Sequence, residues 1–165
     1  MFHDIRVVPT RRFTYRDRIP DDGPVWPDFE NNRIVRHRMH DQLVDRNAQP
    51  GLLAGPRRAE PMVWGGRCLF QFGHLAAEHL SRLPASLYQY PKAPVVFALS
   101  PNRLVRDVPR YFWAMAAWLG AQPPQIHLIS RPFVAAELHV TPQVEQLSPV
   151  PSRTGTWIFW TSCLD

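Results

Sequence analysis

The residues best suited to chemistry lie in one short stretch, from Phe72 to His79. Gly73 stands between a predicted strand and a predicted helix, where a glycine lets the backbone approach a ligand closely. The free N–H groups at the start of a helix favour an anion such as a phosphate. His74 lies in that first turn, where it could donate to a ligand oxygen or act as a base. The alternative is a histidine that only hydrogen-bonds to solvent, and the local pattern leaves both open.

Helical spacing from His74 to at least Leu83 separates an apolar face from a polar one. On a wheel of 100° per residue, the apolar face collects Phe72, Leu75, Ala76, His79, Leu80 and Leu83. The polar face collects His74, Glu78, Ser81 and Arg82. Glu78 and Arg82 are four residues apart, which suits an exposed ion pair. His79 falls in the middle of the apolar face, so we expect a buried histidine with one backbone partner.

A metal site in this stretch is not favoured. His74 and Glu78 could share an ion, but a helical zinc site needs a third protein ligand. The order His-x-x-x-Glu-His also differs from the protease pattern His-Glu-x-x-His. A nucleic-acid platform is not indicated either, because no aromatic residues interleave with the densest basic cluster, Arg33, Arg36, His37, Arg38 and His40.

The elements expected to position these residues alternate as in an α/β fold. Residues 68–72 predict a strand ahead of the helix. The apolar, β-branched run 94–99 is typical of a buried parallel strand. A capped helix at about 108–119 and a second buried strand at 126–130 follow, and 135–140 could form a third. Strand, helix and strand in this order form a βαβ unit, so we predict a Rossmann-like lobe whose strands pair in parallel.

The chain divides into three predicted parts. Residues 1–60 are polar, irregular and rich in proline, and Val7-Val8 could seed a short strand there. Residues 61–145 carry the Rossmann-like alternation. Residues 146–165 form a tail that includes the apolar patch Trp157-Ile158-Phe159-Trp160. We expect this patch to associate with a partner surface.

Composition excludes several classes of protein. The 165 residues are 45% hydrophobic, enough for one domain with a core, whereas 18 prolines exclude a long helical bundle. The net charge of +5 rests on 18 arginines and one lysine among 14 acids, which suggests genome composition rather than nucleic-acid binding. Cys68 and Cys163 imply no disulfide framework. No apolar run approaches the ~20 residues of a membrane span, and no secretion signal is visible. We expect a cytoplasmic or membrane-peripheral protein.

From Gly65 onward the sequence resembles the family 61 glycosyltransferases, which include bacterial capsular-polysaccharide enzymes. Their pattern is Phe-Gly-His-Phe-Leu-x-Glu-x-Leu-x-Arg-Leu ahead of a strand. The matching residues here are Gly65, Gly66, Phe70, Phe72, Gly73, His74, Leu75, Glu78, Leu80, Arg82 and Leu83. Leu75 and Ala76 replace the usual Phe-Leu pair. The likeness covers about residues 63–142.

The resemblance implies the N-terminal, acceptor-side lobe of a GT-B glycosyltransferase, a fold of two Rossmann-like lobes. It implies inverting transfer of a sugar from a nucleotide-sugar to a polysaccharide or glycan acceptor, with no cofactor or essential metal. His74 and Glu78 would be catalytic, and Gly73 and Arg82 would bind substrate. The family's donor lobe, with its arginine-rich segment and Asn-Glu motif, has no counterpart in these residues. We therefore expect an inactive fragment; the alternative is a non-enzymatic remnant that binds carbohydrate or a partner chain.

Overall fold

A mixed sheet forms the centre of the computed structural model, which describes residues 1–8, 23–24, 38–39, 42–43, 55–99 and 103–141. The strand order is β2-β1-β9-β6-β7-β8, and β5 also pairs with β9. The bounds are β1 Phe2–Val8, β2 Gly23–Pro24, β5 Arg57–Arg58, β6 Met62–Cys68, β7 Val95–Leu99, β8 Ile126–Ile129 and β9 Phe133–Val140. A separate pair consists of β3 Arg38–Met39 and β4 Gln42–Leu43. The fold class is therefore α/β.

The predicted βαβ unit is confirmed. β7 and β8 pair in parallel, with Val95 opposite Ile126. The helix α3, Arg110–Trp118, lies between them in sequence, flanked by the short 3-10 turns η3, Val105–Asp107, and η4, Pro123–Gln125. All five residues of β7 are buried, as expected for a parallel strand covered on both faces.

The sheet is not wholly parallel, which corrects the prediction of a parallel sheet. β6 pairs in parallel with β7 and β9, and β5 pairs in parallel with β9. β1 instead runs antiparallel to both β9 and β2. The strand predicted at Val7-Val8 is confirmed but longer, and it is an inner strand of the sheet. The division into three parts stays a prediction, and the tail with its Trp157-Ile158-Phe159-Trp160 patch lies outside the described residues.

The strand predicted at 68–72 is wrong, because β6 ends at Cys68 and a helix begins at Phe72. Consecutive glycines are typical of a turn, but here Gly65 and Gly66 lie inside β6. The register with β7 shifts between Trp64 and Gly66, and Gly66 has a φ of 114°. This β-bulge lets the strand continue through residues whose local signal is a turn.

The predicted helix begins at Phe72 and is not a uniform α-helix. Helical backbone continues through α1 Phe72–His74, the π turn η1 Leu75–His79, the 3-10 turn η2 Leu80–Arg82 and α2 Leu83–Gln89. A 100° wheel does not hold across π and 3-10 turns. Phe72 is consequently 58% exposed and Arg82 only 3% exposed, the reverse of their predicted faces.

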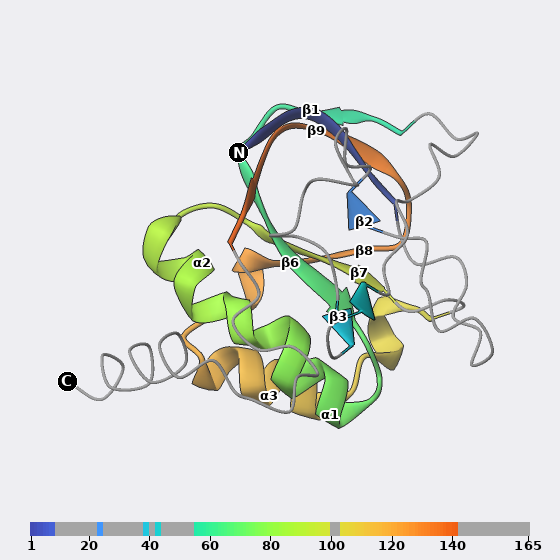
Figure 1. Ribbon diagram of the computed structural model, residues 1–165, viewed down its shortest axis with the longest axis vertical. Coiled ribbons are helices and arrows are strands. Elements are labelled where there is room, and N and C mark those ends of the chain that lie inside the picture. The colour runs from blue at the N-terminus through green and yellow to red at the C-terminus, as the bar shows by residue number, and fades with distance from the viewer. Residues whose placement is uncertain (9–22, 25–37, 40–41, 44–54, 100–102, 142–165) are drawn as a thin grey trace.

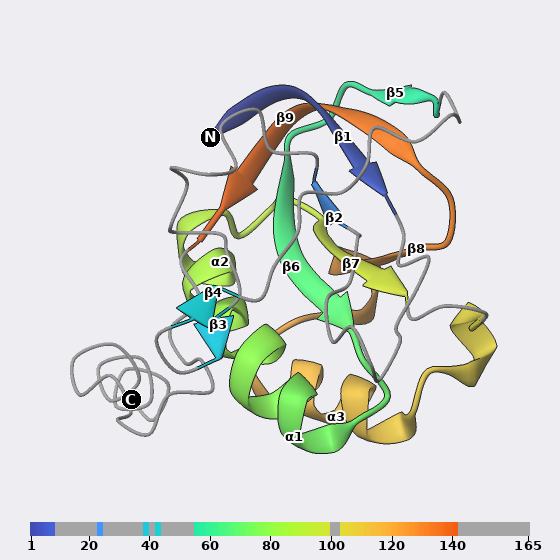
Figure 2. The same cartoon turned by 45° about the vertical axis from the view of Figure 1, so that its right-hand side comes forward.

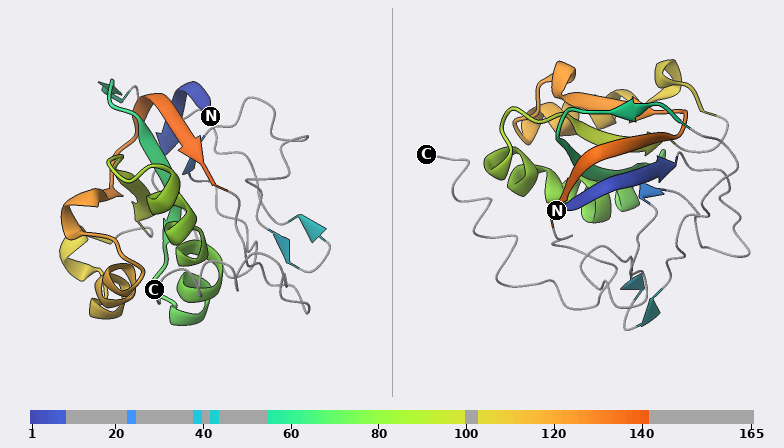
Figure 3. Two further views of the ribbon diagram at one scale, coloured as in Figure 1. Left: turned by 90° about the vertical axis from the view of Figure 1, so that its left-hand side faces the viewer. Right: turned by 90° about the horizontal axis from the view of Figure 1, so that it is seen from above.

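Apolar side chains form two cores, one on each face of the sheet. The core under the helices includes Val63, Cys68, Leu75, Leu80, Leu83, Val95, Phe97 and Phe112. The other core includes Ile5, Val7, Met62, Trp64, Val96, Ala98, Phe133 and Leu138. Figure 1 shows β1 and β9 arching over one end of the molecule, with α1 and α3 at the other end and α2 beside the middle of the sheet. The left-hand view of Figure 3 shows β1 and β9 again at the end away from α1 and α3.

Candidate functional site

The Gly73-His74 stretch leaves the sheet at the carboxyl ends of its parallel strands. β6 ends at Cys68 opposite Leu99, the last residue of β7. Figure 2 shows the chain passing from the arrowhead of β6 into α1. In open α/β sheets, ligands bind outside the carboxyl ends of the strands. We call this end of the sheet the carboxyl edge.

Gly73 and His74 are both at the carboxyl edge. Gly73 is exposed, and a Cβ placed on it would meet nothing within 4 Å. Packing therefore does not demand a glycine here, and the position has room for a ligand. His74 is half-buried and is the last residue of α1. The turn is closed by the Leu75 N–H, which donates to the Gln71 carbonyl at 3.0 Å.

Arg82 is not part of this group. It follows His74 by eight residues, roughly 12 Å of helical rise, and it is buried. Its carbonyl accepts hydrogen bonds from Ser86 Oγ at 2.9 Å and Thr141 Oγ1 at 3.5 Å. The prediction that Arg82 lies on an exposed face is therefore wrong, and its ion pair with Glu78 stays a prediction. Glu78 lies in the π turn, and its side chain is outside the described residues.

His79 is a buried histidine with a backbone partner, as predicted. It is 3% exposed, and its Nδ1 accepts a hydrogen bond from the Arg67 N–H at 3.3 Å. A Cβ on Gly66 would lie 2.8 Å from the same Nδ1. The bulge in β6 and the π turn therefore meet at this imidazole. Single π turns occur frequently at functional sites, and this one joins the His74 turn to the sheet.

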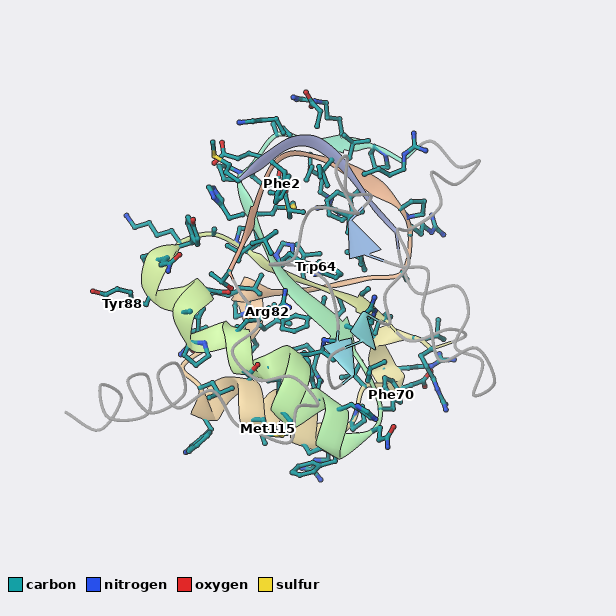
Figure 4. The ribbon with its side chains drawn as sticks, viewed as in Figure 1. Phe2, Trp64, Phe70, Arg82, Tyr88 and Met115 are labelled. Carbon is teal, nitrogen blue, oxygen red and sulfur yellow. The ribbon has the colours of Figure 1, made fainter. Side chains whose placement is uncertain are left out.

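Phe70 and Phe72 were named in the sequence analysis, but neither ring was assigned a role at the carboxyl edge. The guanidinium carbon of Arg103 lies 5.1 Å from the centre of the Phe70 ring. The exposed Phe72 ring meets Tyr111 edge to face, with ring centres 5.5 Å apart. Figure 4 shows Phe70 at the end of the molecule where α1 begins. Their position in the sequence could have indicated this role, because Phe70 and Phe72 follow the buried strand β6 and Arg103 follows the next parallel strand, β7.

Positive charge collects on the same edge. Arg103 and Arg106 are exposed between β7 and α3, the exposed Arg110 begins α3, and the exposed Arg131 follows β8. Asp107 is the one acid between residues 103 and 131. Its Oδ2 accepts a hydrogen bond from the Leu104 N–H at 2.9 Å, and its Oδ1 is 4.0 Å from Arg106 Nε. The described part of this edge therefore favours an anionic ligand.

A second polar group lies between α2 and β9, and we call it the α2–β9 seam. Ser86 Oγ is 2.8 Å from Thr141 Oγ1. The ring of Tyr90, the residue directly after α2, stacks on His139, with ring centres 4.1 Å apart. His139 Nε2 lies 2.6 Å from Glu137 Oε1. Four helical residues rise about 6 Å and two strand residues about 6.6 Å. The spacing from Ser86 to Tyr90 therefore matches that from Thr141 to His139, so both pairs can be in contact.

The α2–β9 seam is enclosed rather than open. Ser86 and Thr141 are at most 1% exposed, and the His139 side chain is 11% exposed. A substrate would have to separate α2 from β9 to reach these groups. The seam therefore fixes α2 on the sheet, and it holds the helical run whose other end carries His74.

Other reactive groups are suppressed by burial. Burial raises the pKa of the Cys68 thiol to about 12, so its thiolate is absent near neutral pH. Burial also raises the pKa of Tyr111, with a smaller contribution from Cys68. Within the described residues, no three histidine, cysteine or acidic side chains gather as a metal site. In the same part of the chain, no helix combines the length and apolar character needed to cross a membrane.

Comparison of the chain with family models, with curated proteins and with solved structures gives no match. A functional assignment for this chain therefore depends on the geometry of the carboxyl edge and on the sequence resemblance. Both point to the same stretch of chain, the Gly73-His74 turn.

Proposed function

We propose that the chain is the acceptor-side lobe of a glycosyltransferase of the family 61 type. It would transfer a sugar from a nucleotide-sugar to a polysaccharide or glycan acceptor. One observation carries the proposal: Gly73 and His74 follow β6 at the carboxyl edge, and space is open around Gly73. This is the edge at which α/β sheets take their ligands.

In an inverting transfer, the acceptor hydroxyl oxygen attacks the anomeric carbon of the donor sugar. The bond from that carbon to the diphosphate breaks on the opposite face and leaves its electron pair on the diphosphate. His74 would remove the hydroxyl proton, with Glu78 assisting it, and Gly73 would allow the acceptor to approach the backbone. Arg82 is buried beside Thr141, so it would orient the helical run from within.

The proposed reaction uses the nucleotide-sugar as co-substrate and needs no cofactor or metal. The donor lobe would supply the positive charge that stabilises the departing diphosphate. Holding donor and acceptor in register requires both lobes. The 165-residue chain alone would therefore bind acceptor without transferring sugar.

The test compares the chain alone with the chain joined, after Asp165, to the donor lobe of a family 61 glycosyltransferase. Each is incubated with a panel of nucleotide-sugars and glycan acceptors, and the products are measured by mass spectrometry. We expect transfer only from the joined protein. His74→Ala should lower its rate by about 10²–10⁴-fold, the contribution typical of a general base. His3→Ala is the matched control, because His3 is an exposed histidine on β1, away from α1.

An unchanged rate for His74→Ala would overturn the assignment of the base. Carbohydrate binding without transfer by the joined protein would replace the proposal with the non-enzymatic alternative. Transfer by the chain alone would show that one lobe is sufficient.

A further inference from the structure

The carboxyl edge holds one exposed aromatic ring in a fixed place. Phe72 is 58% exposed, yet its ring packs edge to face against Tyr111 at 5.5 Å. Tyr111 belongs to α3, so the ring is braced by a different element from the one that carries it. A large exposed ring that is held by packing offers a flat apolar platform with little ordering cost on binding.

A cation lies at the same edge and is also held by packing. Arg103 lies over Phe70, two residues before Phe72 in the chain. A guanidinium placed on an aromatic face keeps its planar fork, which can bind a carboxylate through two parallel hydrogen bonds. Asp107 is engaged by the Leu104 N–H and is paired with Arg106. The nearest acid in sequence therefore already has partners of its own.

We infer that the carboxyl edge binds an acidic saccharide, so that the acceptor of the proposed transfer carries uronate groups. One sugar ring would stack on Phe72, and a carboxylate on it or on its neighbour would bind Arg103. Arg106, Arg110 and Arg131 would attract the carboxylates of the same saccharide. This inference rests on the proposed function, because it names the substrate class of that site.

A saccharide fits better than a single-stranded nucleic acid. Nucleic-acid grooves use successive rings on which successive bases stack. Among the described residues of this edge, Phe72 is the one aromatic ring that is more than half exposed, since Phe70 and Tyr111 are partly buried. One exposed ring, with a cation at the same edge of the sheet, matches a single acidic sugar unit.

The test measures binding to the full 165-residue chain by isothermal titration calorimetry. The probes are a galacturonate hexamer, a neutral maltohexaose and a thymidylate hexamer. We expect the galacturonate hexamer to bind most tightly and to weaken as salt is raised. Arg103→Gln and Phe72→Ser should each weaken its binding at least fivefold.

Arg58→Gln is the matched control for Arg103→Gln. Arg58 also lies over a phenylalanine, with its guanidinium carbon 5.4 Å from the centre of the Phe133 ring, and it is exposed. It belongs to β5, which Figure 2 shows at the opposite end of the molecule from α1. We expect Arg58→Gln to leave the affinity within twofold of the unchanged protein.

Equal weakening by Arg58→Gln would overturn the inference, because binding would then follow net charge rather than this edge. Tighter binding of maltohexaose, or of the thymidylate hexamer, would also overturn it. Failure of the proposed function looks different: the joined protein would bind galacturonate at this edge but transfer no sugar. Transfer onto neutral acceptors alone would overturn the inference and leave the proposed function standing.

Discussion

The carboxyl edge and the α2–β9 seam use the same kinds of side chain in opposite ways. Each has a histidine and an aromatic ring, and each joins a strand end to a helix. At the edge, Phe72 and Arg103 are exposed. In the seam, Ser86 is fully buried and His139 is covered by Tyr90. Residue type alone therefore does not separate a candidate binding site from a structural contact, whereas exposure to solvent does.

The contrast assigns different costs to substitution in the two regions. Truncating a buried, bonded group leaves a cavity and an unsatisfied partner, so it lowers the free energy of unfolding. Truncating an exposed group does little to stability and acts on binding alone. Two histidines five residues apart in one helical run show both outcomes. Substitution of the buried His79 should lower stability, whereas substitution of the half-buried His74 should leave stability nearly unchanged.

His79→Ala should give the largest loss of stability, about 3 kcal/mol. It removes a buried ring and leaves the Arg67 N–H without the acceptor that it has at 3.3 Å. Urea denaturation monitored by circular dichroism measures the change. His79→Asn is the control, because Oδ1 of asparagine can occupy the place of Nδ1, and it should recover part of the loss. Equal loss in both variants would show that the hydrogen bond contributes nothing.

The buried Cys68 thiol predicts a loss of stability at alkaline pH. In the folded state its pKa is raised by burial from 9.0 to about 12. Above pH 9 the unfolded chain therefore releases a proton that the folded chain retains. Stability contributed by the neutral thiol is full below pH 9 and falls by at most about 1.4 kcal/mol per pH unit up to pH 12.

Cys68→Ala isolates this effect. It should cost about 1 kcal/mol at pH 7, where a buried sulfur is lost. The difference from the unchanged protein should shrink as the pH rises above 9, because only the unchanged protein carries the titrating thiol. Burial, the larger cause of the raised pKa of Tyr111, is common to both proteins, whereas the smaller contribution from Cys68 is lost in Cys68→Ala and adds to the difference. A difference that stays constant from pH 7 to pH 11 would contradict the burial of Cys68.

Breaking the pair in the α2–β9 seam should have a smaller effect, about 1 kcal/mol. Glu137→Gln removes the charge from a contact of 2.6 Å with His139, but Glu137 is partly exposed and water replaces part of the interaction. A double-mutant cycle with His139→Ala measures the coupling between the two side chains. A coupling of zero would show that the stacked Tyr90 holds His139 without help from Glu137.

Much of the fold could be predicted because its signals are local. The runs at 94–99 and 126–130 are apolar and β-branched, and a helix between them leaves parallel pairing as the normal outcome. The predicted cap by Asp107 is wrong, because α3 begins at Arg110 without a side-chain cap and Asp107 accepts from the Leu104 N–H. The position of β1 could not be predicted, because its partner β9 lies more than a hundred residues away. The glycines of β6 carry a turn signal, whereas their fit inside the strand depends on distant residues. A Cβ on Gly65 would lie 2.5 Å from the Phe97 ring, and one on Gly66 would lie 2.8 Å from His79 Nδ1.

The candidate site was predicted in part. His79 was assigned correctly because it lies among leucines on any helical wheel. Arg82 and Phe72 were assigned to the wrong faces because a 100° step assumes one hydrogen-bond pattern throughout the helix. The π turn at Leu75–His79 breaks that assumption, and no residue type marks it. Arg103 was missed because its contact with Phe70 joins two loops that are separate in sequence.

The smallest predicted effect on stability is at the carboxyl edge. His74→Ala, Phe72→Ser and Arg103→Gln should each change the free energy of unfolding by about 0.5 kcal/mol or less. The reason is exposure: Phe72 and Arg103 reach solvent, and His74 is only half-buried. Thermal denaturation of the three variants beside His79→Ala checks this directly. A large loss for His74→Ala with none for His79→Ala would reverse the comparison. The π turn would then present His79 to ligands and place His74 in the core, and the catalytic proposal would move with it.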